Sequence, residues 1–231
     1  AESARQYTDI EFYNWSDATG PLEAVDEILS DLRDFSYRTI VIDDTMRADH
    51  AALIQDKLLN SNRLFTASTI GTLRMQKDAT EQDILRINAH QADIAMRKAW
   101  DIIKPGLTEE NIALAIQNSF SDQGALPQFS IVASGSNSAF PHHQTGSRKL
   151  KEGDAIVIDL GGKFEGYASD ITRMSSIGAP PKDYALIHQI VEDAVCAAMA
   201  AARPGQIAKN VDRAAREVIE KAGFGKYFVH R

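Results

Sequence analysis

The sequence from Asp154 to Arg173 reads Asp-Ala-Ile-Val-Ile-Asp-Leu-Gly-Gly-Lys-Phe-Glu-Gly-Tyr-Ala-Ser-Asp-Ile-Thr-Arg, and it decides the fold. Two runs typical of β-strands flank a glycine-rich turn. Each run carries one aspartate, Asp159 in the first and Asp170 in the second. Aspartate is depleted in strands, so two of them within otherwise apolar runs need a reason. Coordination of a metal ion is the most economical one.

Side-chain alternation puts the two aspartates on one face of this predicted hairpin, because alternate residues of a strand point to the same side. If Gly161–Gly166 form the turn, Asp159 lies directly opposite Asp170, with the Cβ atoms roughly 5 Å apart. Like charges at that separation repel and raise each other's pKa, whereas one or two divalent cations turn the repulsion into attraction. The alternative is a hairpin whose acids are solvated near its mouth, since aspartate is also common near turns.

Composition and charge restrict the class of protein. Hydrophobic residues make up 44% and charged residues 25% of the 231 positions, which is ordinary for a soluble globular protein. The net charge of −7 argues weakly against nucleic acid or an anionic membrane as a partner. The sequence contains no apolar run of 18 residues, so no membrane-spanning helix is predicted. The single cysteine, Cys196, lies in an alanine-rich helical run and is expected in the core, and the absence of a possible disulfide favours a cytoplasmic protein.

Residues 1–75 have the texture of an α/β domain. Thr39–Ile42 and Arg63–Phe65 are expected to form short buried strands, and Pro21–Leu32 and Ala48–Leu59 are expected to form amphipathic helices. No phosphate-binding glycine loop is present there, which argues against a nucleotide site.

The polar segment around Lys77 makes a plausible domain boundary, dividing the chain into 1–75 and 76–231. Thr80 followed by Asp83 has the pattern of a capping box. We therefore expect a long helix from Thr80 to about Ile103. The chain also does not begin with methionine, so it is expected to be processed or to begin partway into a longer protein.

An internal repeat with an offset of 99 residues organises the second part of the chain. Adding 99 maps Pro105, Gly106, Asn111, Ile112, Ala115, Gly124 and Phe129 onto Pro204, Gly205, Asn210, Val211, Ala214, Gly223 and Phe228. Seven matches in one gapless register predict two copies of a helix-helix-strand unit. The first copy contains the hairpin with both aspartates. The second copy has no counterpart of that hairpin before Arg231, so we expect the sequence to be truncated within it.

The hairpin follows two further motifs, Ala-Ser-Gly-Ser-Asn-Ser-Ala-Phe-Pro-His at 133–142 and Arg-Lys-Leu-Lys-Glu-Gly-Asp at 148–154. Together with the repeat, this succession resembles the pita-bread metallopeptidases, in the branch of the Xaa-Pro dipeptidases (prolidases) and Xaa-Pro aminopeptidases. The resemblance is specific over about residues 70–231. It implies an α/β fold, with a duplicated pita-bread domain of the α+β type that is incomplete at its C-terminus. Residues 1–75 then resemble part of a creatinase-like N-terminal domain.

The resemblance also implies roles for individual residues. Asp159 and Asp170 match the first two metal ligands, and Asp170 would bridge two ions. His142 matches the histidine near the scissile bond. His230 matches the first histidine of a segment whose metal-ligating histidine comes four residues later, beyond Arg231. The glutamates that complete the family's site also lie beyond it.

The implied reaction is hydrolysis of the bond before proline, through two divalent ions that share a bridging hydroxide. Carboxylate ligands favour Mn²⁺, and an additional histidine permits Co²⁺ or Zn²⁺. The implied substrates are peptides with proline at the second position, and the implied assembly is a homodimer. We expect the 231 residues alone to bind metal poorly and to be inactive, because two carboxylates are too few to hold two ions.

Two other functions remain open at this point. A creatinase-like C–N hydrolase keeps the fold, but that branch lacks the metal ligands, and both aspartates are present here. A non-catalytic pita-bread module that binds peptides or proteins belongs to a different class. Replacement of ligands beyond Arg231 would leave the present sequence unchanged, so the aspartates count against this module without deciding the matter.

Overall fold

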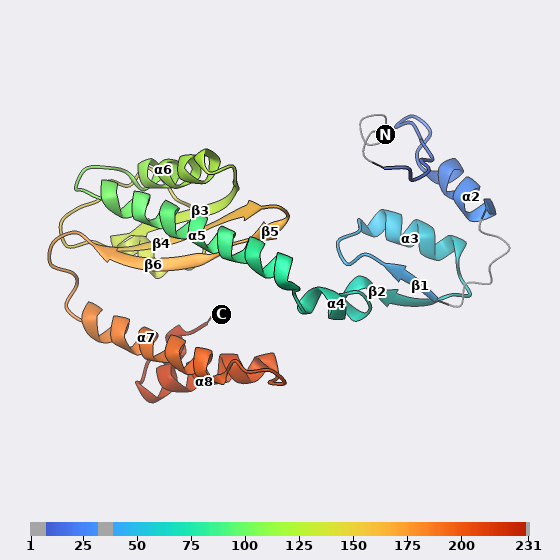
Figure 1. Ribbon diagram of the computed structural model, residues 1–231. Helices are drawn as coiled ribbons and strands as arrows, with labels where there is room; N and C mark the ends of the chain where they lie inside the picture. The colour runs from blue at the N-terminus through green and yellow to red at the C-terminus, as the bar shows by residue number, and fades with distance from the viewer. Residues whose placement is uncertain (1–7, 32–38, 230–231) are drawn as a thin grey trace. The chain divides into compact units, whose positions relative to one another are not determined.

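The computed structural model describes residues 8–31 and 39–229 of the 231 (Figure 1). The chain divides into two compact units, residues 1–78 and 79–231. In the first unit, β1 pairs with β2 in parallel through an intervening helix, which is the α/β arrangement that the sequence predicts. Its elements are α2 (Leu22–Asp31), β1 (Thr39–Ile42), α3 (Ala48–Lys57), β2 (Asn62–Phe65), the 3₁₀ turn η1 (Thr66–Ser68) and α4 (Gly71–Met75).

The second unit is built on one antiparallel sheet with β4 at its centre. β3 pairs with β4 along one edge, and β5 and β6 pair with it along the other. The elements are α5 (Ala79–Ile102), α6 (Glu109–Asp122), β3 (Leu126–Ser134), η2 (Gly135–Ala139), β4 (Ala155–Phe164), β5 (Tyr167–Ala168), β6 (Ile171–Ser176), α7 (Tyr184–Ala201), α8 (Ala208–Lys221) and η3 (Gly225–Tyr227).

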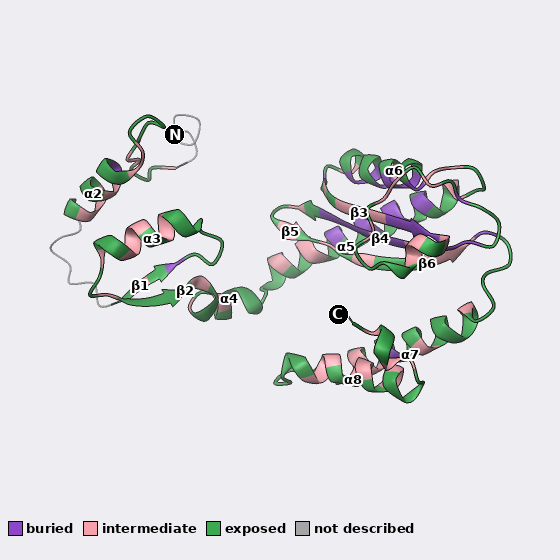
Figure 2. Ribbon diagram, turned by 180° about the vertical axis from the view of Figure 1, so that it is seen from behind, coloured by how far each residue is buried: buried purple, intermediate pink, exposed green. Residues whose placement is uncertain are grey.

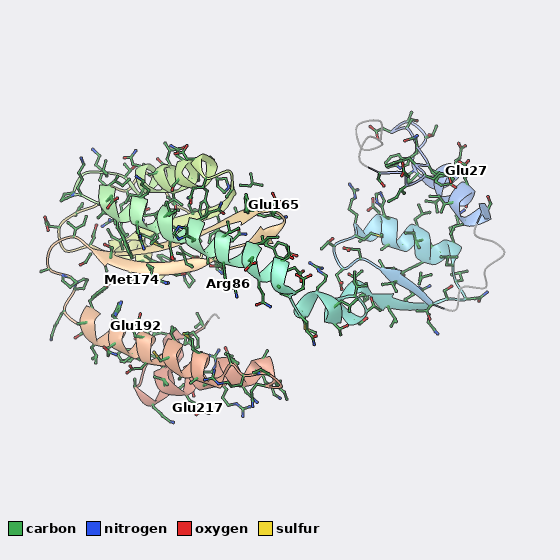
Figure 3. The ribbon with its side chains drawn as sticks, viewed as in Figure 1. Glu27, Arg86, Glu165, Met174, Glu192 and Glu217 are labelled. Atoms are coloured by element: carbon green, nitrogen blue, oxygen red, sulfur yellow. The ribbon has the colours of Figure 1, made fainter. Side chains whose placement is uncertain are left out.

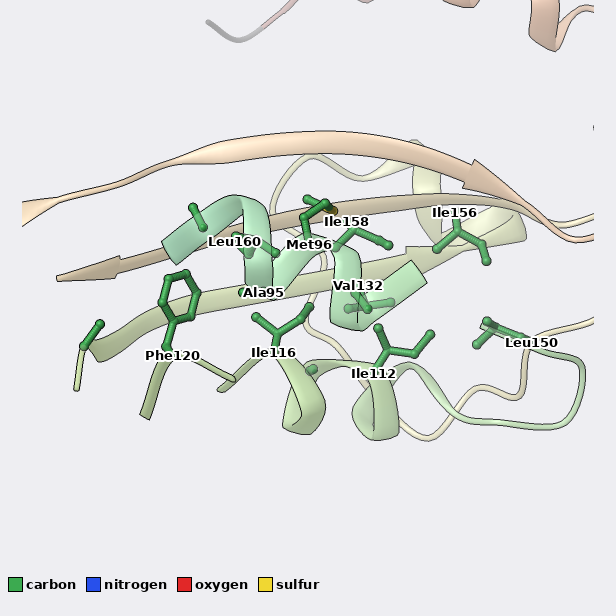
Figure 4. Close-up of a cluster of buried hydrophobic side chains, with 14 of the residues drawn as sticks. Ala95, Met96, Ile112, Ile116, Phe120, Val132, Leu150, Ile156, Ile158 and Leu160 are labelled. Carbon is green, nitrogen blue, oxygen red and sulfur yellow. The ribbon is translucent and has the colours of Figure 1, made fainter. Parts of the chain in front are cut away.

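Helices α5 and α6 cover one face of this sheet (Figures 1 and 2). Ile156, Ile158 and Leu160 alternate along β4 and are completely buried against the helices, where they meet Met96 and Phe120 in one cluster (Figure 4). Because side chains alternate across a strand, the residues between them, including Asp159, point to the opposite face. The apolar core therefore determines which face carries the polar side chains.

The hairpin turn is shorter than the sequence predicts. Phe164 pairs directly with Tyr167, so the turn consists of Glu165 and Gly166 alone, both with positive φ (50° and 85°) as a tight two-residue hairpin turn requires. Figure 3 labels Glu165 at this end of the hairpin. The predicted turn over Gly161–Gly166 is wrong because the first two of these glycines belong to β4.

Gly161 and Gly162 lie within the strand because no side chain would fit there. A Cβ atom on Gly161 would come within 2.3 Å of the Ser169 carbonyl oxygen, and one on Gly162 within 2.5 Å of the Phe120 ring. Glycine in a strand interior commonly marks such a close approach. The pair of glycines thus reflects tight packing of the hairpin and of α6 against β4, and not a turn.

The helix boundaries confirm the helical part of the predicted repeat. Adding 99 to the C-terminal residue of α5 gives that of α7, and adding 99 to both ends of α6 gives both ends of α8. The glycines that follow these helices adopt the same left-handed backbone, with φ of 88° at Gly106 and 82° at Gly205. The two helix pairs are therefore copies of one unit.

Two local predictions are wrong. Helix α5 already begins at Ala79, so Thr80 lies inside its first turn and not at the N-cap of a capping box. Cys196 is exposed and not part of the core. The repeat explains the second result, because Cys196 corresponds to Arg97 of α5, which lies on the exposed side of that helix. Among residues 8–31 and 39–229, no helix is long and apolar enough to cross a membrane.

The close contact between Gly162 and the Phe120 ring leads us to predict that a larger residue at position 162 destabilises the fold. Gly162→Ala is expected to lower the free energy of unfolding by about 1–3 kcal/mol, because the new methyl group overpacks the Phe120 ring. Gly146→Ala is the matched control, since its Cβ would come no closer than 3.8 Å to the Gln144 carbonyl oxygen. Urea unfolding measures both variants, and an equal loss of stability in the two would contradict the packing described here.

Candidate metal centre

Asp159 lies in the middle of β4 on the face opposite α5 and α6. It pairs with Thr172 of β6, whose hydroxyl donates a hydrogen bond of 2.6 Å to Asp159 Oδ1. This bond fixes one carboxylate oxygen of Asp159. The second oxygen is left to accept from another donor or to bind a cation, because an ionised carboxylate has about four lone-pair positions.

Asp170 lies in the break between β5 and β6, where regular pairing is interrupted. Because the turn is tight, Asp159 faces Thr172, two residues beyond Asp170. The predicted directly opposed pair is therefore wrong. A shift of two residues preserves the face, so Asp159 and Asp170 become diagonal neighbours, for which a regular sheet gives about 7–8 Å instead of about 5 Å.

The two carboxylates still influence each other. Partial burial of its carboxyl group raises the pKa of Asp170, and the negative charge of Asp159 raises it further. A divalent cation between the two groups would remove this unfavourable interaction and would suit their hard oxygen atoms. The two aspartates therefore fit one side of a metal site. Within residues 8–31 and 39–229, no group of three or more histidine, cysteine, aspartate or glutamate side chains could hold an ion.

His142 lies on the irregular segment that leads from η2 towards β4. His142 is exposed, whereas the side chain of the next residue, His143, is only 16% exposed. The structure thus gives adjacent histidines different environments. His230, the other histidine implied by the family resemblance, lies outside the described residues.

Glu109 is a polar residue that sequence reasoning missed. It opens α6, it is completely buried, and its Oε2 lies 2.9 Å from His143 Nε2. Ser134 donates to Oε1 from its backbone N–H (2.8 Å) and its hydroxyl (2.7 Å), and Asn137 donates from Nδ2 (3.1 Å). Burial alone would raise the pKa of Glu109, but these hydrogen bonds outweigh it, so the pKa is lowered.

A second buried carboxylate lies beside the first. Asp154 accepts two hydrogen bonds from the Arg148 guanidinium (2.6 and 2.9 Å) and one from the Lys151 backbone N–H (2.9 Å). Arg148 also donates to the Ser134 hydroxyl, so this pair is linked to the hydrogen bonds around Glu109. The Arg148 hydrogen bond lowers the pKa of Asp154, although burial opposes it.

The model of metallopeptidase family M24 matches residues 83–231, which is more than half of the chain. The chain belongs to metallopeptidase family M24. The resemblance that the hairpin, the Pro-His motif and the repeat indicate is thereby confirmed.

Named relatives and the solved structures of other proteins also resemble this M24 chain. A probable dipeptidase PepE of Mycobacterium bovis is 35% identical over 100% of the chain and 60% of its own length. An Xaa-Pro dipeptidase of Pyrococcus furiosus is 38% identical over 70% of the chain and 47% of its own length. The crystal structure of a dipeptidase from Pyrococcus horikoshii matches the whole chain with a TM-score of 0.85 at 37% identity, and covers 64% of that chain.

A prolidase from Thermococcus sibiricus also matches the whole chain, with a TM-score of 0.86 at 30% identity, over 63% of its own chain. These likenesses confirm the predicted α/β fold. The chain spans about 60% of the length of the relatives that it matches over its full extent.

The Arg148–Asp154 pair of this M24 chain predicts a pH-dependent stability. A lowered pKa stabilises the folded state above the ordinary value of 3.8, and that contribution is lost as the pH falls through the folded value. Asp154→Asn is therefore expected to cost about 1–3 kcal/mol at pH 7 and less near pH 3, which lies below the ordinary value of 3.8.

Denaturant unfolding of wild type and Asp154→Asn at both pH values measures this difference. Glu152→Gln removes an exposed carboxylate two residues earlier, and is expected to change stability by less than about 0.5 kcal/mol at either pH. A cost for Asp154→Asn that does not vary with pH would contradict the ionic character of the pair.

Proposed function

We propose that this protein is a metal-dependent peptidase that hydrolyses Xaa-Pro peptide bonds through a dinuclear metal site with a bridging hydroxide. The observation that carries the proposal is the hairpin in which Asp159 and Asp170 share the face of the sheet opposite the helices. Similarity to proteins named Xaa-Pro dipeptidase supports the choice of reaction. Both aspartates are also the reason to prefer a metal-dependent enzyme over a metal-free relative.

Each aspartate would contribute oxygen ligands. Asp159 is already oriented by the Thr172 hydroxyl, which would leave its second oxygen for a cation. Asp170 would bridge the two ions, which is the role that the family resemblance implies for it. Two divalent ions would supply an activated nucleophile and polarise the scissile carbonyl.

The metal would be manganese in this proposal, because carboxylate oxygens suit Mn²⁺, with Co²⁺ or Zn²⁺ as substitutes if histidine also binds. Two carboxylates satisfy only part of the coordination of two ions. The other ligands would have to come from outside the described residues. His230 would belong to that part of the site.

His142 would handle protons at the reacting peptide bond. An imidazole accepts a proton at its free ring nitrogen and donates one in its protonated form, so His142 could carry a proton to the departing nitrogen of the substrate or donate a hydrogen bond to the developing oxyanion. The bond before proline is a tertiary amide without an N–H group. Recognition would therefore rest on the proline ring and the carbonyl group. A homodimer, which the family resemblance implies, and a cytoplasmic location, which the single cysteine favours, belong to the same proposal.

Replacing either aspartate tests the site. In the intact protein supplied with Mn²⁺, Asp159→Asn and Asp170→Asn are each expected to lower kcat/KM for an Xaa-Pro dipeptide by at least about 100-fold. Loss of a direct ligand should exceed the effect of losing one of its supporting hydrogen bonds. Glu165→Gln is the matched control, because Glu165 is an exposed carboxylate in the same hairpin. Activity that survives both aspartate substitutions would refute the proposed site.

The 231-residue chain by itself makes a separate prediction. With two carboxylates as its described ligands, it is expected to bind Mn²⁺ with a Kd of about 1 mM or weaker, and to leave Xaa-Pro dipeptides uncleaved. Calorimetric titration with Mn²⁺ and an assay for released proline measure these two properties. Metal-dependent cleavage by these residues alone would show that the ligand set is larger than proposed.

A further inference from the structure

The segment that carries His142 is anchored by a single buried carboxylate. Glu109 receives hydrogen bonds from Ser134, at the end of β3, and from Asn137 in η2. It also contacts His143 Nε2 at 2.9 Å, and the backbone N–H of Gly146 lies 3.4 Å from its Oε2. These donors are spread over the whole segment 134–146. One side chain therefore fixes the start, the middle and the end of that segment.

The hydrogen bond to Glu109 determines which ring nitrogen of His143 carries a proton on that side. An ionised carboxylate can only accept, so the proton must lie on His143 Nε2. Asn137 Nδ2 is also 3.3 Å from that nitrogen, but a donor cannot satisfy an N–H group. Asn137 Nδ2 instead donates its hydrogens to the two oxygens of Glu109, at 3.1 and 3.3 Å. His143 is thus held by Glu109 through a defined ring nitrogen.

The internal repeat shows that the fold of a helix pair does not require this carboxylate. The counterpart of Glu109 in the second copy is Ala208, at the first residue of α8, although α6 and α8 have equivalent boundaries. The preceding Thr108, whose hydroxyl caps α6, corresponds to Ile207. The first copy therefore carries a carboxylate at a position where the second copy has alanine.

A buried charge is also a poor device for stability alone. Removing a carboxylate from water is costly, and apolar packing of similar volume often stabilises a protein as well or better. Its hydrogen bonds, however, confine the groups that donate them to one arrangement. The Glu109 anchor is thus better suited to fixing the position of a segment than to increasing overall stability.

We propose that Glu109 is a positioning residue, which holds the segment 134–146 through Ser134, Asn137 and His143 and so fixes the place of His142 beside the hairpin. The catalytic part of this proposal rests on the role proposed above for His142. The anchoring part does not, because it concerns only the folded segment. His143 acts in this arrangement as a tether and not as a second proton carrier.

Glu109→Gln tests the anchor with little change in shape. A glutamine offers one acceptor oxygen and turns an NH₂ group towards the remaining donors, so the arrangement around it cannot be kept intact. In the 231-residue chain, we expect the ¹⁵N signals of the His143 ring to lose the preference for the Nε2–H form. Amide hydrogen exchange in residues 135–146 should accelerate at least about tenfold, because bonds to a charged acceptor are lost.

Ile116→Val is the matched control. Ile116 is completely buried in the same helix, and its truncation weakens the core without touching the anchor. It should leave the His143 ring signals unchanged and accelerate exchange across the whole unit instead of within one segment. If Glu109→Gln does not fold, Asn137→Ala is measured in its place. Asn137 is half-buried, and its loss removes one of the hydrogen-bond donors to Glu109, so amide exchange should accelerate at the same residues. Unchanged ring signals and unchanged exchange at 135–146 in a folded Glu109→Gln chain would overturn the proposal.

Activity measurements in the intact protein separate this proposal from the proposed function. Glu109→Gln is expected to lower kcat by about 100-fold with little change in KM, as a small misplacement of a catalytic group does. His142→Gln tests the role of His142 itself. Full activity in His142→Gln would overturn the catalytic role while leaving the anchor to be judged by the ring signals and the exchange rates.

Discussion

The pairing of β4 with β5 and β6 is the constraint on which the candidate site depends. It places two carboxylates on one face of a sheet whose other face is committed to the core by Ile156, Ile158 and Leu160. Asp159 cannot turn to the other face of β4 without turning these apolar side chains into solvent. Partial burial raises the pKa of Asp170, and the negative charge of Asp159 raises it further, so the repulsion between the two groups is part of the folded structure. A cation bound between the two groups would remove that repulsion.

Polar anchors at the end of β3 complete this arrangement from the helix side of the sheet. Glu109 holds the segment that carries His142, and the pair of Arg148 and Asp154 joins the same group of hydrogen bonds through Ser134. The two faces of the sheet thus carry different kinds of side chain. One presents the carboxylates, and the other buries the apolar core together with the groups that position the neighbouring segment.

Much of this could be predicted from the sequence because side-chain alternation and a gapless repeat leave few alternatives. The shared face of Asp159 and Asp170 follows from alternation, and it survives a register error of two residues. The exact register does not follow, because a Gly-Gly pair indicates a turn and a close contact equally well; only the packing of Phe120 decides between them. Glu109 was missed because its partners lie 25 or more residues away. Its one signal was the mismatch with Ala208 in the repeat.

The most direct test of the central claim is to titrate Mn²⁺ into the ¹⁵N-labelled chain and follow the paramagnetic broadening of its amide signals. This effect reports even weak binding and identifies the residues nearest the ion. We predict that signals around Asp159 and Asp170 disappear first, and that Asp170→Asn abolishes this preference. Strongest broadening elsewhere would contradict a metal site in the hairpin. An example is broadening at Asp43 and Asp44, two consecutive aspartates in the first unit.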